Sequence, residues 1–267
     1  MVDYGLTGKV ALVTGVSRHI GIGAAIAHSL AEAGVNVFTI YYRPFDELMP
    51  WGSKSTEAEE IIESLKLLSV KAEGLEANLA EPHIPEQIFD RVEKSFGFVD
   101  ILVNNAAHDQ QADIYSLSAD LLDAHYAVNV RGTMLLCAEF AKRHDGRPGG
   151  RIINLTSGQS LGPMPENLPY AITKGGIEAL TISLSANLAN KGITVNAVDP
   201  GPTNTGWMSD ELFLELEAKA PFGRVGTPED AARVVLFLAS SQSQWITGQI
   251  IRSRGGQYLS LTNLMFT

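Results

Sequence analysis

The sequence predicts an α/β fold in which a parallel sheet of about seven strands is covered by helices on both faces. Short apolar runs alternate with segments of helical spacing along the chain, as is typical of a doubly wound sheet with right-handed crossovers. The 267 residues suffice for a large α/β domain, and 45% hydrophobic against 19% charged residues indicates a globular protein. Neither a linker nor an internal repeat interrupts the pattern, so we expect a single domain over residues 1–267.

The elements follow from the spacing of apolar residues. The first strand is expected at 9–14, between Gly8 and Gly15, and the first helix at 22–33, where Ile22, Ile26 and Leu30 share a face. The other strands are expected near 35–41, 70–76, 100–104, 150–156, 193–198 and 249–252, and the other helices near 56–69, 84–95, 118–143, 169–190 and 228–240. Ligands of such sheets bind at the carboxyl ends of the strands.

The turn between the first strand and the first helix has the residues of a phosphate-binding site. Gly15, Gly21 and Gly23 let the backbone approach a pyrophosphate, and the helix N-terminus supplies N–H groups and a positive dipole. The alternative is an ordinary tight turn between strand and helix. The other motifs of the chain favour the phosphate site.

Ser157, Tyr170 and Lys174 form a pattern suited to carbonyl and alcohol chemistry. Tyr170 and Lys174 are four residues apart on a predicted helix and therefore share a face. A fixed positive charge lowers the pKa of a neighbouring phenol, and the Ser157 hydroxyl can hold a substrate oxygen against it. The result is a proton donor and acceptor. The Tyr–Lys spacing alone occurs by chance in many helices, so it indicates a catalytic site only together with the other motifs of the chain.

Five motifs occur in order along the chain. They are the glycine turn, Asn104-Asn105-Ala106-Ala107, Asn129 within Val-Asn-Val-Arg-Gly, Ser157 with Tyr170 and Lys174, and Pro200-Gly201 followed by Thr203 and Thr205. With these motifs the chain resembles the short-chain dehydrogenase/reductases from about Gly8 to Gly256. Residues 223–230 and 246–249 resemble the bacterial 3-oxoacyl-[acyl-carrier-protein] reductase branch. The resemblance implies a Rossmann-type fold and an NAD(P)-dependent enzyme.

The resemblance also implies roles for individual residues. Tyr170 would exchange the proton and Ser157 would hold the substrate oxygen. Lys174 would lower the tyrosine pKa and contact the nicotinamide ribose, and Asn129 would hold a water beside it. Tyr170 and Lys174 would also contact the cofactor, together with Gly15, Ser17, Arg18, Gly21, Ile22, Gly23, Tyr41, Arg43, Asn78, Leu79, Asn105, Ala106, Ala107, Pro200, Gly201, Thr203 and Thr205.

The end of the second strand favours NADP(H) over NAD(H). NAD-preferring relatives carry an acid there, and this chain has Tyr41. Arg18 and Arg43 can instead pair with a 2′-phosphate. NAD(H) is the alternative, because Asp46 and Glu47 would reverse the preference if they fold back.

The chain differs from the usual family motifs at three places. Five residues rather than three separate Gly15 from Gly21, which changes where Arg18 lies. Asn78 replaces a usual Asp, and its carbonyl can make the same contact with adenine. Ser253-Arg254-Gly255-Gly256 replaces a common Val-Asp-Gly-Gly, which bears on subunit contacts more than on chemistry.

Two irregular segments flank the expected pocket. The insertion, residues 43–54, exceeds the usual connection of about two to six residues and either walls the adenosine pocket or elaborates the surface. The lid segment, residues 202–222, corresponds to the mobile substrate lid of the family, and a small helix packed on the core is compatible with that role. The expected substrate contacts are His108, Gln159, Ser160, Met164, Trp207 and Met208, with an exposed loop histidine as the alternative for His108.

Composition excludes several functions. A net charge of −10 argues against general nucleic-acid binding, and an anionic carrier-protein partner would need a local patch of Lys or Arg that the sequence does not locate. No apolar run approaches the roughly 20 residues of a membrane span, and no signal region is seen, so we expect a cytoplasmic protein.

The six histidines lack metal-ligand spacing, so no metal site is expected, and Cys137 is expected in the core. From the family we expect a homotetramer with contacts on helices 118–143 and 169–190.

We therefore expect an NADP(H)-dependent oxidoreductase that interconverts a ketone and a secondary alcohol. A 3-oxoacyl thioester is the first expected substrate, and a sugar or small alcohol is the second. A non-catalytic NADP(H)-binding sensor or scaffold is disfavoured, because all four catalytic positions are intact. An epimerase or dehydratase of the extended relatives usually carries an added C-terminal domain, for which the chain has no room.

Overall fold

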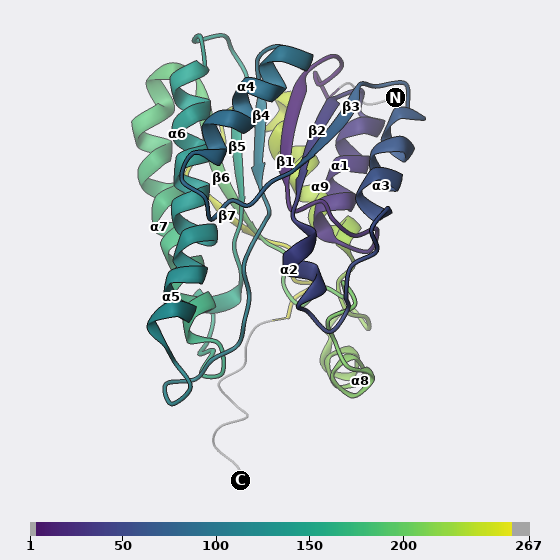
Figure 1. Ribbon diagram of the computed structural model, residues 1–267, viewed down its shortest axis with the longest axis vertical. Helices are drawn as coiled ribbons and strands as arrows, with labels where there is room; N and C mark the ends of the chain where they lie inside the picture. Colours follow the sequence, from purple (N-terminus) through teal and green to yellow (C-terminus); the bar gives the residue numbers. More distant parts are fainter. Residues whose placement is uncertain (1–3, 258–267) are drawn as a thin grey trace.

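The computed structural model describes residues 4–257, and its seven strands form one parallel sheet (Figure 1). The strands are β1 (Val10–Thr14), β2 (Asn36–Tyr41), β3 (Ala72–Glu76), β4 (Ile101–Asn104), β5 (Gly150–Leu155), β6 (Ile193–Asp199) and β7 (Ile250–Arg252). Their order in the sheet is β3-β2-β1-β4-β5-β6-β7. The predicted doubly wound sheet is confirmed.

The helices include each of the six predicted ranges and two others, one in the insertion and one in the lid segment, where a small helix was an expected alternative. They are α1 (Ile22–Glu32), α2 (Arg43–Glu47), α3 (Glu57–Lys66), α4 (Ile84–Phe96), α5 (Ala119–His125), α6 (Thr133–Arg143), α7 (Leu168–Leu188), α8 (Asp210–Lys219) and α9 (Pro228–Ala239). None of the helices described within residues 4–257 has the length and apolar character needed to cross a bilayer.

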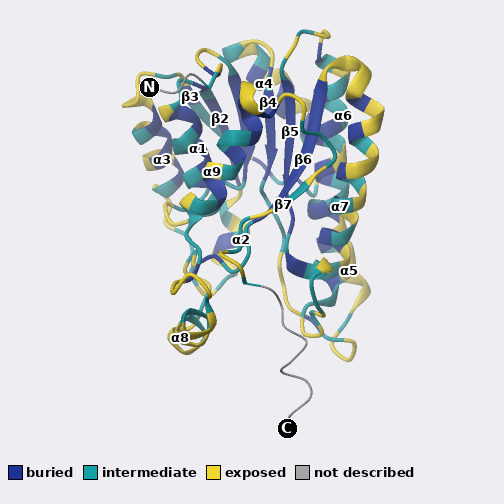
Figure 2. Cartoon of the chain, turned by 180° about the vertical axis from the view of Figure 1, so that it is seen from behind, coloured by how far each residue is buried: buried dark blue, intermediate teal, exposed yellow. Residues whose placement is uncertain are grey.

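The core lies on both faces of the sheet. Successive strand side chains point to opposite faces, so Leu12 and Val13 of β1 enter two different clusters. The Val13 cluster lies under α1, α3 and α9, and the Leu12 cluster lies under α4, α6 and α7. Figure 2 shows the inner strands of the sheet as buried and the outer sides of α3, α6 and α7 as exposed. Burial on both faces explains why the strands read as continuous apolar runs.

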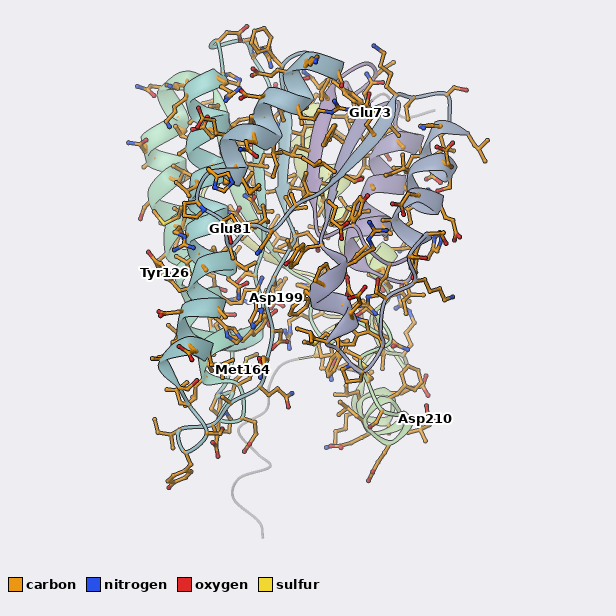
Figure 3. All side chains as sticks on the ribbon, viewed as in Figure 1. Glu73, Glu81, Tyr126, Met164, Asp199 and Asp210 are labelled. Atoms are coloured by element: carbon orange, nitrogen blue, oxygen red, sulfur yellow. The ribbon has the colours of Figure 1, made fainter. Side chains whose placement is uncertain are left out.

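The strand order reverses between β1 and β4, and the loops of both halves meet at the carboxyl edge of the sheet. Helices α2 and α8 lie toward this edge in Figure 1. Figure 3 places Asp199, the last residue of β6, and Met164 on the same side, whereas Glu73 of β3 lies at the opposite end of the sheet. The sheet therefore brings the predicted site residues to one edge.

The predicted helix at 118–143 is not a uniform α-helix. A π-helical turn, Tyr126–Gly132, separates α5 from α6 and contains Asn129. Such turns widen a helix by one residue and are frequent at functional sites. Apolar spacing cannot reveal one extra residue within an otherwise helical run, so the sequence analysis missed this turn.

Helix α8 lies within the lid segment. It begins at a Ser209 cap that accepts a hydrogen bond from Leu212 N at 3.2 Å, and it ends with Lys219 in its last turn. None of its residues is buried. The prediction of a helix here is right, but its packing on the core is wrong, because α8 stands away from the rest of the domain (Figure 1).

Candidate active site

The four predicted catalytic residues meet at the carboxyl edge. Ser157 follows β5, Tyr170 and Lys174 lie in the first two turns of α7, and Asn129 lies in the π-helical turn. The Ser157 side chain lies close enough to the Tyr170 phenol to lower its pKa. Lys174 Nζ lies 5.4 Å from the centroid of the Tyr170 ring and donates to the Leu155 carbonyl at 2.8 Å. Phenol, hydroxyl and ammonium are therefore brought together, as the spacing predicts.

Burial governs the protonation of this cluster. It raises the pKa of the Tyr170 phenol, and the Asp109 carboxylate raises it further. The Asp199 carboxylate also raises the Tyr170 pKa, whereas the neighbouring Ser157 hydroxyl lowers it. Burial also lowers the pKa of Lys174 to about 8. The prediction of a lowered phenol pKa is thus wrong, because lost hydration of the phenolate is the largest effect.

Asn129 ties the loop after β4 to α7. Its Oδ1 accepts from His108 N at 2.7 Å, and its Nδ2 donates to His108 O at 2.9 Å and to Thr173 Oγ1 at 3.0 Å. The His108 ring lies 4.7 Å from the His125 ring and 5.1 Å from the Phe45 ring. Burial lowers the pKa of His108. His108 is therefore a packed side chain, and the exposed-loop alternative is wrong.

The turn after β1 fits a phosphate group. Gly15 has a φ of +77°, and Asn105 Nδ2 donates to the carbonyls of Thr14 and Gly15 at 2.9 and 3.0 Å. Helix α1 follows Gly21, which offers no side-chain cap, and its first turn contains no acid. The first N–H groups of α1 thus have no side chain that competes with an anion.

The other predicted cofactor positions lie along the same edge. They are Ser17, Ile22 and Gly23 beside the turn, Tyr41 at the end of β2, Asn78 and Leu79 after β3, Ala106 and Ala107 after β4, and Pro200, Gly201, Thr203 and Thr205 after β6. Asn78 Oδ1 accepts from Ala80 N at 3.0 Å, which shapes the loop after β3.

Arg43 lies among carboxylates. Its Nε and Nη2 contact the Glu76 carboxylate at 3.1 and 2.5 Å, and its Nη1 lies 3.4 Å from Glu59. Tyr41 donates to the same Glu59 at 3.2 Å. A 2′-phosphate would therefore have to share Arg43 with Glu76.

Arg18 is enclosed by the insertion. Its Nη1 donates to the Thr205 carbonyl at 2.9 Å, and its Nε lies 3.5 Å from Asp46 Oδ1. The Trp51 ring lies 4.4 Å from the Arg18 guanidinium carbon, and its Nε1 donates to Asp46 at 2.9 Å. Burial lowers the pKa of Arg18, and Asp46 opposes this change. The insertion thus folds back over the glycine turn, and its reading as a surface elaboration is wrong.

Comparison with known proteins assigns the family. Residues 15–257 match the family model described as enoyl-(acyl carrier protein) reductase. The chain is 47% identical over 250 residues to an uncharacterised oxidoreductase, YjdA, of Bacillus subtilis (strain 168), with 93% of this chain and 96% of that protein covered. A short-chain dehydrogenase from Burkholderia cenocepacia J2315, solved in complex with NADP, superposes with a TM-score of 0.84 at 31% identity, covering 94% of this chain and 98% of that one.

The chain belongs to the short-chain dehydrogenase/reductase family. It is also 36% identical over 254 residues to the 3-oxoacyl-[acyl-carrier-protein] reductase FabG of Staphylococcus epidermidis (strain ATCC 35984), which covers 94% of this chain and 99% of that protein. The predicted resemblance to this branch of the family is confirmed.

This short-chain dehydrogenase/reductase carries a buried ion pair beside its catalytic loop. Arg254 Nη1 lies 3.1 Å from both carboxylate oxygens of Asp199, and the two side chains are 6% and 1% exposed. Asp199 also accepts from Gly201 N at 2.9 Å. A Cβ atom on Gly158 would lie 2.6 Å from Arg254 Nη1, so the guanidinium packs against the residue that follows Ser157. From the sequence, the departure at residues 253–256 was expected to bear on subunit contacts more than on chemistry, and this role of Arg254 was not predicted.

The predicted substrate residues divide into two groups. Gln159 and Ser160 follow Ser157, and Met164 lies in the same loop before α7 (Figure 3). Trp207 and Met208 lie in the lid segment, where Trp207 Nε1 donates to Thr203 O at 3.0 Å and Trp207 stays 46% exposed.

Asp109 is a site residue that the sequence analysis missed. Asn167 Nδ2 donates to its carboxylate at 2.7 Å, and its charge acts on both Tyr170 and Lys174. Its place two residues after Ala107 is the only signal that the sequence offers. No group of three or more His, Cys, Asp or Glu side chains within residues 4–257 is arranged to hold a metal ion.

Proposed function

We propose that the protein is an NADP(H)-dependent oxidoreductase that interconverts a ketone and a secondary alcohol, with 3-oxoacyl thioesters as the first substrate class. The observation that carries this proposal is the convergence of Ser157, Tyr170 and Lys174, whose Nζ lies 5.4 Å from the Tyr170 ring centroid, at the edge of the sheet where α1 begins without a cap. The relative named as a 3-oxoacyl-[acyl-carrier-protein] reductase supports the substrate class. The relative solved with NADP supports the cofactor.

The residues at the edge fit this cofactor. The glycine turn and the N-terminus of α1 would hold the pyrophosphate, and Asn105 keeps the turn against β4. Lys174 would reach the nicotinamide ribose, and Thr203 and Thr205 would orient the carboxamide. The insertion folds back and brings Asp46 within 3.5 Å of Arg18 Nε, but Arg18 is still the better placed of the two predicted arginines for a 2′-phosphate. Arg43 is bound by two nitrogens to Glu76, whereas Asp46 faces one nitrogen of Arg18.

Bound NADPH supplies the hydride of this reaction. Because burial raises its pKa, Tyr170 is a neutral phenol at neutral pH and serves as the proton donor to the carbonyl oxygen. The Ser157 hydroxyl orients that oxygen and stabilises the phenolate that remains. The Lys174 ammonium, charged below a pKa of about 8, stabilises the same phenolate. Asn129 would hold a water that returns the proton.

Buried acceptors suggest a substrate with polar groups. Among the described residues, Gln159 Oε1, Asn167 Oδ1 and His108 Nε2 are buried without a hydrogen-bond partner. All three belong to residues of the loops that follow β4 and β5, and such atoms carry a free-energy cost unless a partner is supplied. The amide N–H groups of a pantetheine arm would supply donors, and the hydroxyl groups of a sugar, the second candidate substrate, would do the same.

The lid segment would close over this substrate. It begins beside Arg18 and Asp199 and contains α8, none of whose residues is buried. Elements with few buried contacts are the ones that open and close at low free-energy cost.

We also propose a homotetramer, because α7 and the helices from α5 to α6 expose large apolar side chains such as Ile172, Ile182 and Met134.

A cofactor and substrate panel tests the proposal. Purified protein would be assayed for NADPH and NADH oxidation with acetoacetyl thioesters, diketones, aryl ketones and keto-sugars. Turnover of thioesters with NADPH is expected. Turnover of keto-sugars or small ketones alone would favour the second candidate, and NADPH binding without any turnover would favour a sensor.

A further inference from the structure

A cavity of about 300 Å³ beside the catalytic loop is rich in arginine. Four arginines line it, Arg224, Arg233, Arg252 and Arg254, and the only acidic lining residue among the described residues is Asp230. The whole chain has a net charge of −10, so a concentration of arginines at one cavity is a local reversal of its charge.

The ion pairs at this cavity leave positive charge unneutralised. Arg224 contacts both Asp230 oxygens at 2.6 and 2.9 Å, and Arg233 contacts the same carboxylate at 3.1 Å. Two arginines therefore share one acid. Arg252 has no carboxylate partner among the described residues, and its Nη2 donates to Ser160 Oγ at 3.2 Å. Arg254 is neutralised by Asp199, so about two positive charges face the cavity.

The cavity borders the active site through two contacts. Arg252 bonds to Ser160, three residues after Ser157, and Arg254 packs against Gly158. The cavity is also lined by Pro202 and Phe222, the two ends of the lid segment. A substrate whose carbonyl lies at Ser157 could thus extend an arm past the lid toward the arginines.

We propose that this cavity binds the phosphate of a phosphopantetheine arm, and that Arg233 and Arg252 are its specificity-determining residues. This inference rests on the proposed thioester substrate. Guanidinium groups match phosphate oxygens in paired, directional hydrogen bonds, and both side chains have donors that no described residue uses. The local basic patch that an anionic carrier would need is located here, at the lid.

A matched pair of substrates tests this site. Acetoacetyl-phosphopantetheine and acetoacetyl-pantetheine differ only by the phosphate, and neither carries the adenine that could occupy the cofactor site. We expect a KM about tenfold lower or more for the phosphorylated substrate, with a similar kcat, as for one hydrogen bond to a charged group. This ratio should fall toward one in the Arg233→Gln/Arg252→Gln variant and at high salt. A ratio near one in the wild type, or one unchanged in the variant, would overturn the proposal.

A control variant and a binding experiment distinguish a wrong phosphate site from a wrong substrate class. Arg91→Gln removes an exposed arginine that pairs with Glu73 far from the cavity, and it should keep the wild-type ratio. Binding of phosphopantetheine against pantetheine would be measured by calorimetry on the NADP-saturated protein. Phosphate-dependent binding that the double variant loses, without reduction of any thioester, would reject the substrate proposal and keep the site. Acetoacetyl-coenzyme A and an acetoacetyl carrier protein would then show which source of the arm is preferred.

Discussion

The two halves of the carboxyl edge hold their side chains by different means. After β4 and β5, Asn129 and Lys174 are buried and bonded to backbone carbonyls, with few charges involved. After β1 and β2, Arg18 and Arg43 lie in contact with carboxylates from the insertion and from β3 and α3. Side chains that bond to backbone carbonyls have partners fixed by the strands and helices themselves, whereas side chains that pair with carboxylates depend on where other side chains end.

Tyr170→Phe tests the catalytic half and should have the largest effect. Loss of the phenol removes the proton donor, so kcat for ketone reduction should fall by about 10²- to 10⁴-fold. NADPH affinity, measured by fluorescence titration, should change little, because phenylalanine keeps the aromatic ring beside Lys174. Activity close to that of the wild type would contradict the assigned mechanism.

Arg254→Met tests the buried ion pair that Arg254 forms with Asp199 next to the catalytic half. Removal of one partner leaves the buried Asp199 carboxylate uncompensated, which typically costs about 3–5 kcal/mol of stability. The free energy of unfolding in urea should fall by an amount of this order. The double variant Asp199→Asn/Arg254→Met should recover part of the loss, and no recovery would mean that packing rather than charge is responsible.

Arg18→Gln tests the adenosine half. We expect KM for NADPH to rise by about tenfold or more relative to KM for NADH, as for a lost hydrogen bond to a phosphate. Arg43→Gln serves as the matched comparison, and its effect should be smaller because Glu76 already occupies its guanidinium. Equal changes for both cofactors in Arg18→Gln would show that this arginine does not contact the 2′-phosphate.

The pH profile should show the smallest effect and again concerns the catalytic half. Burial lowers the pKa of Lys174 to about 8, so its ammonium is present below that pH and is lost above it. The rise in the pKa of Tyr170 keeps the phenol protonated over the same range. Initial-rate kcat/KM for reduction should therefore be level near pH 6–7 and fall by up to about tenfold per unit above pH 8. A level profile through pH 9 would show that the Lys174 charge is dispensable.

The sequence predicted the elements better than the contacts of their side chains. The strand positions follow from apolar runs, and Tyr170 and Lys174 share a face because the helix repeat requires it. The π-helical turn around Asn129 was missed, since one extra residue does not disturb the apolar spacing. The rise in the Tyr170 pKa was also missed, because burial depends on the loops that surround the phenol.

The sequence by itself determined the parallel sheet, the glycine turn at α1 and the order of the catalytic residues, because these depend on local spacing and on the short connections between neighbouring elements. Only the tertiary structure decided that Asp46 and Trp51 enclose Arg18, that Arg254 pairs with Asp199, and that arginines gather at the lid. Those contacts join residues far apart in the chain through long, flexible side chains, and no sequence period encodes where such side chains end.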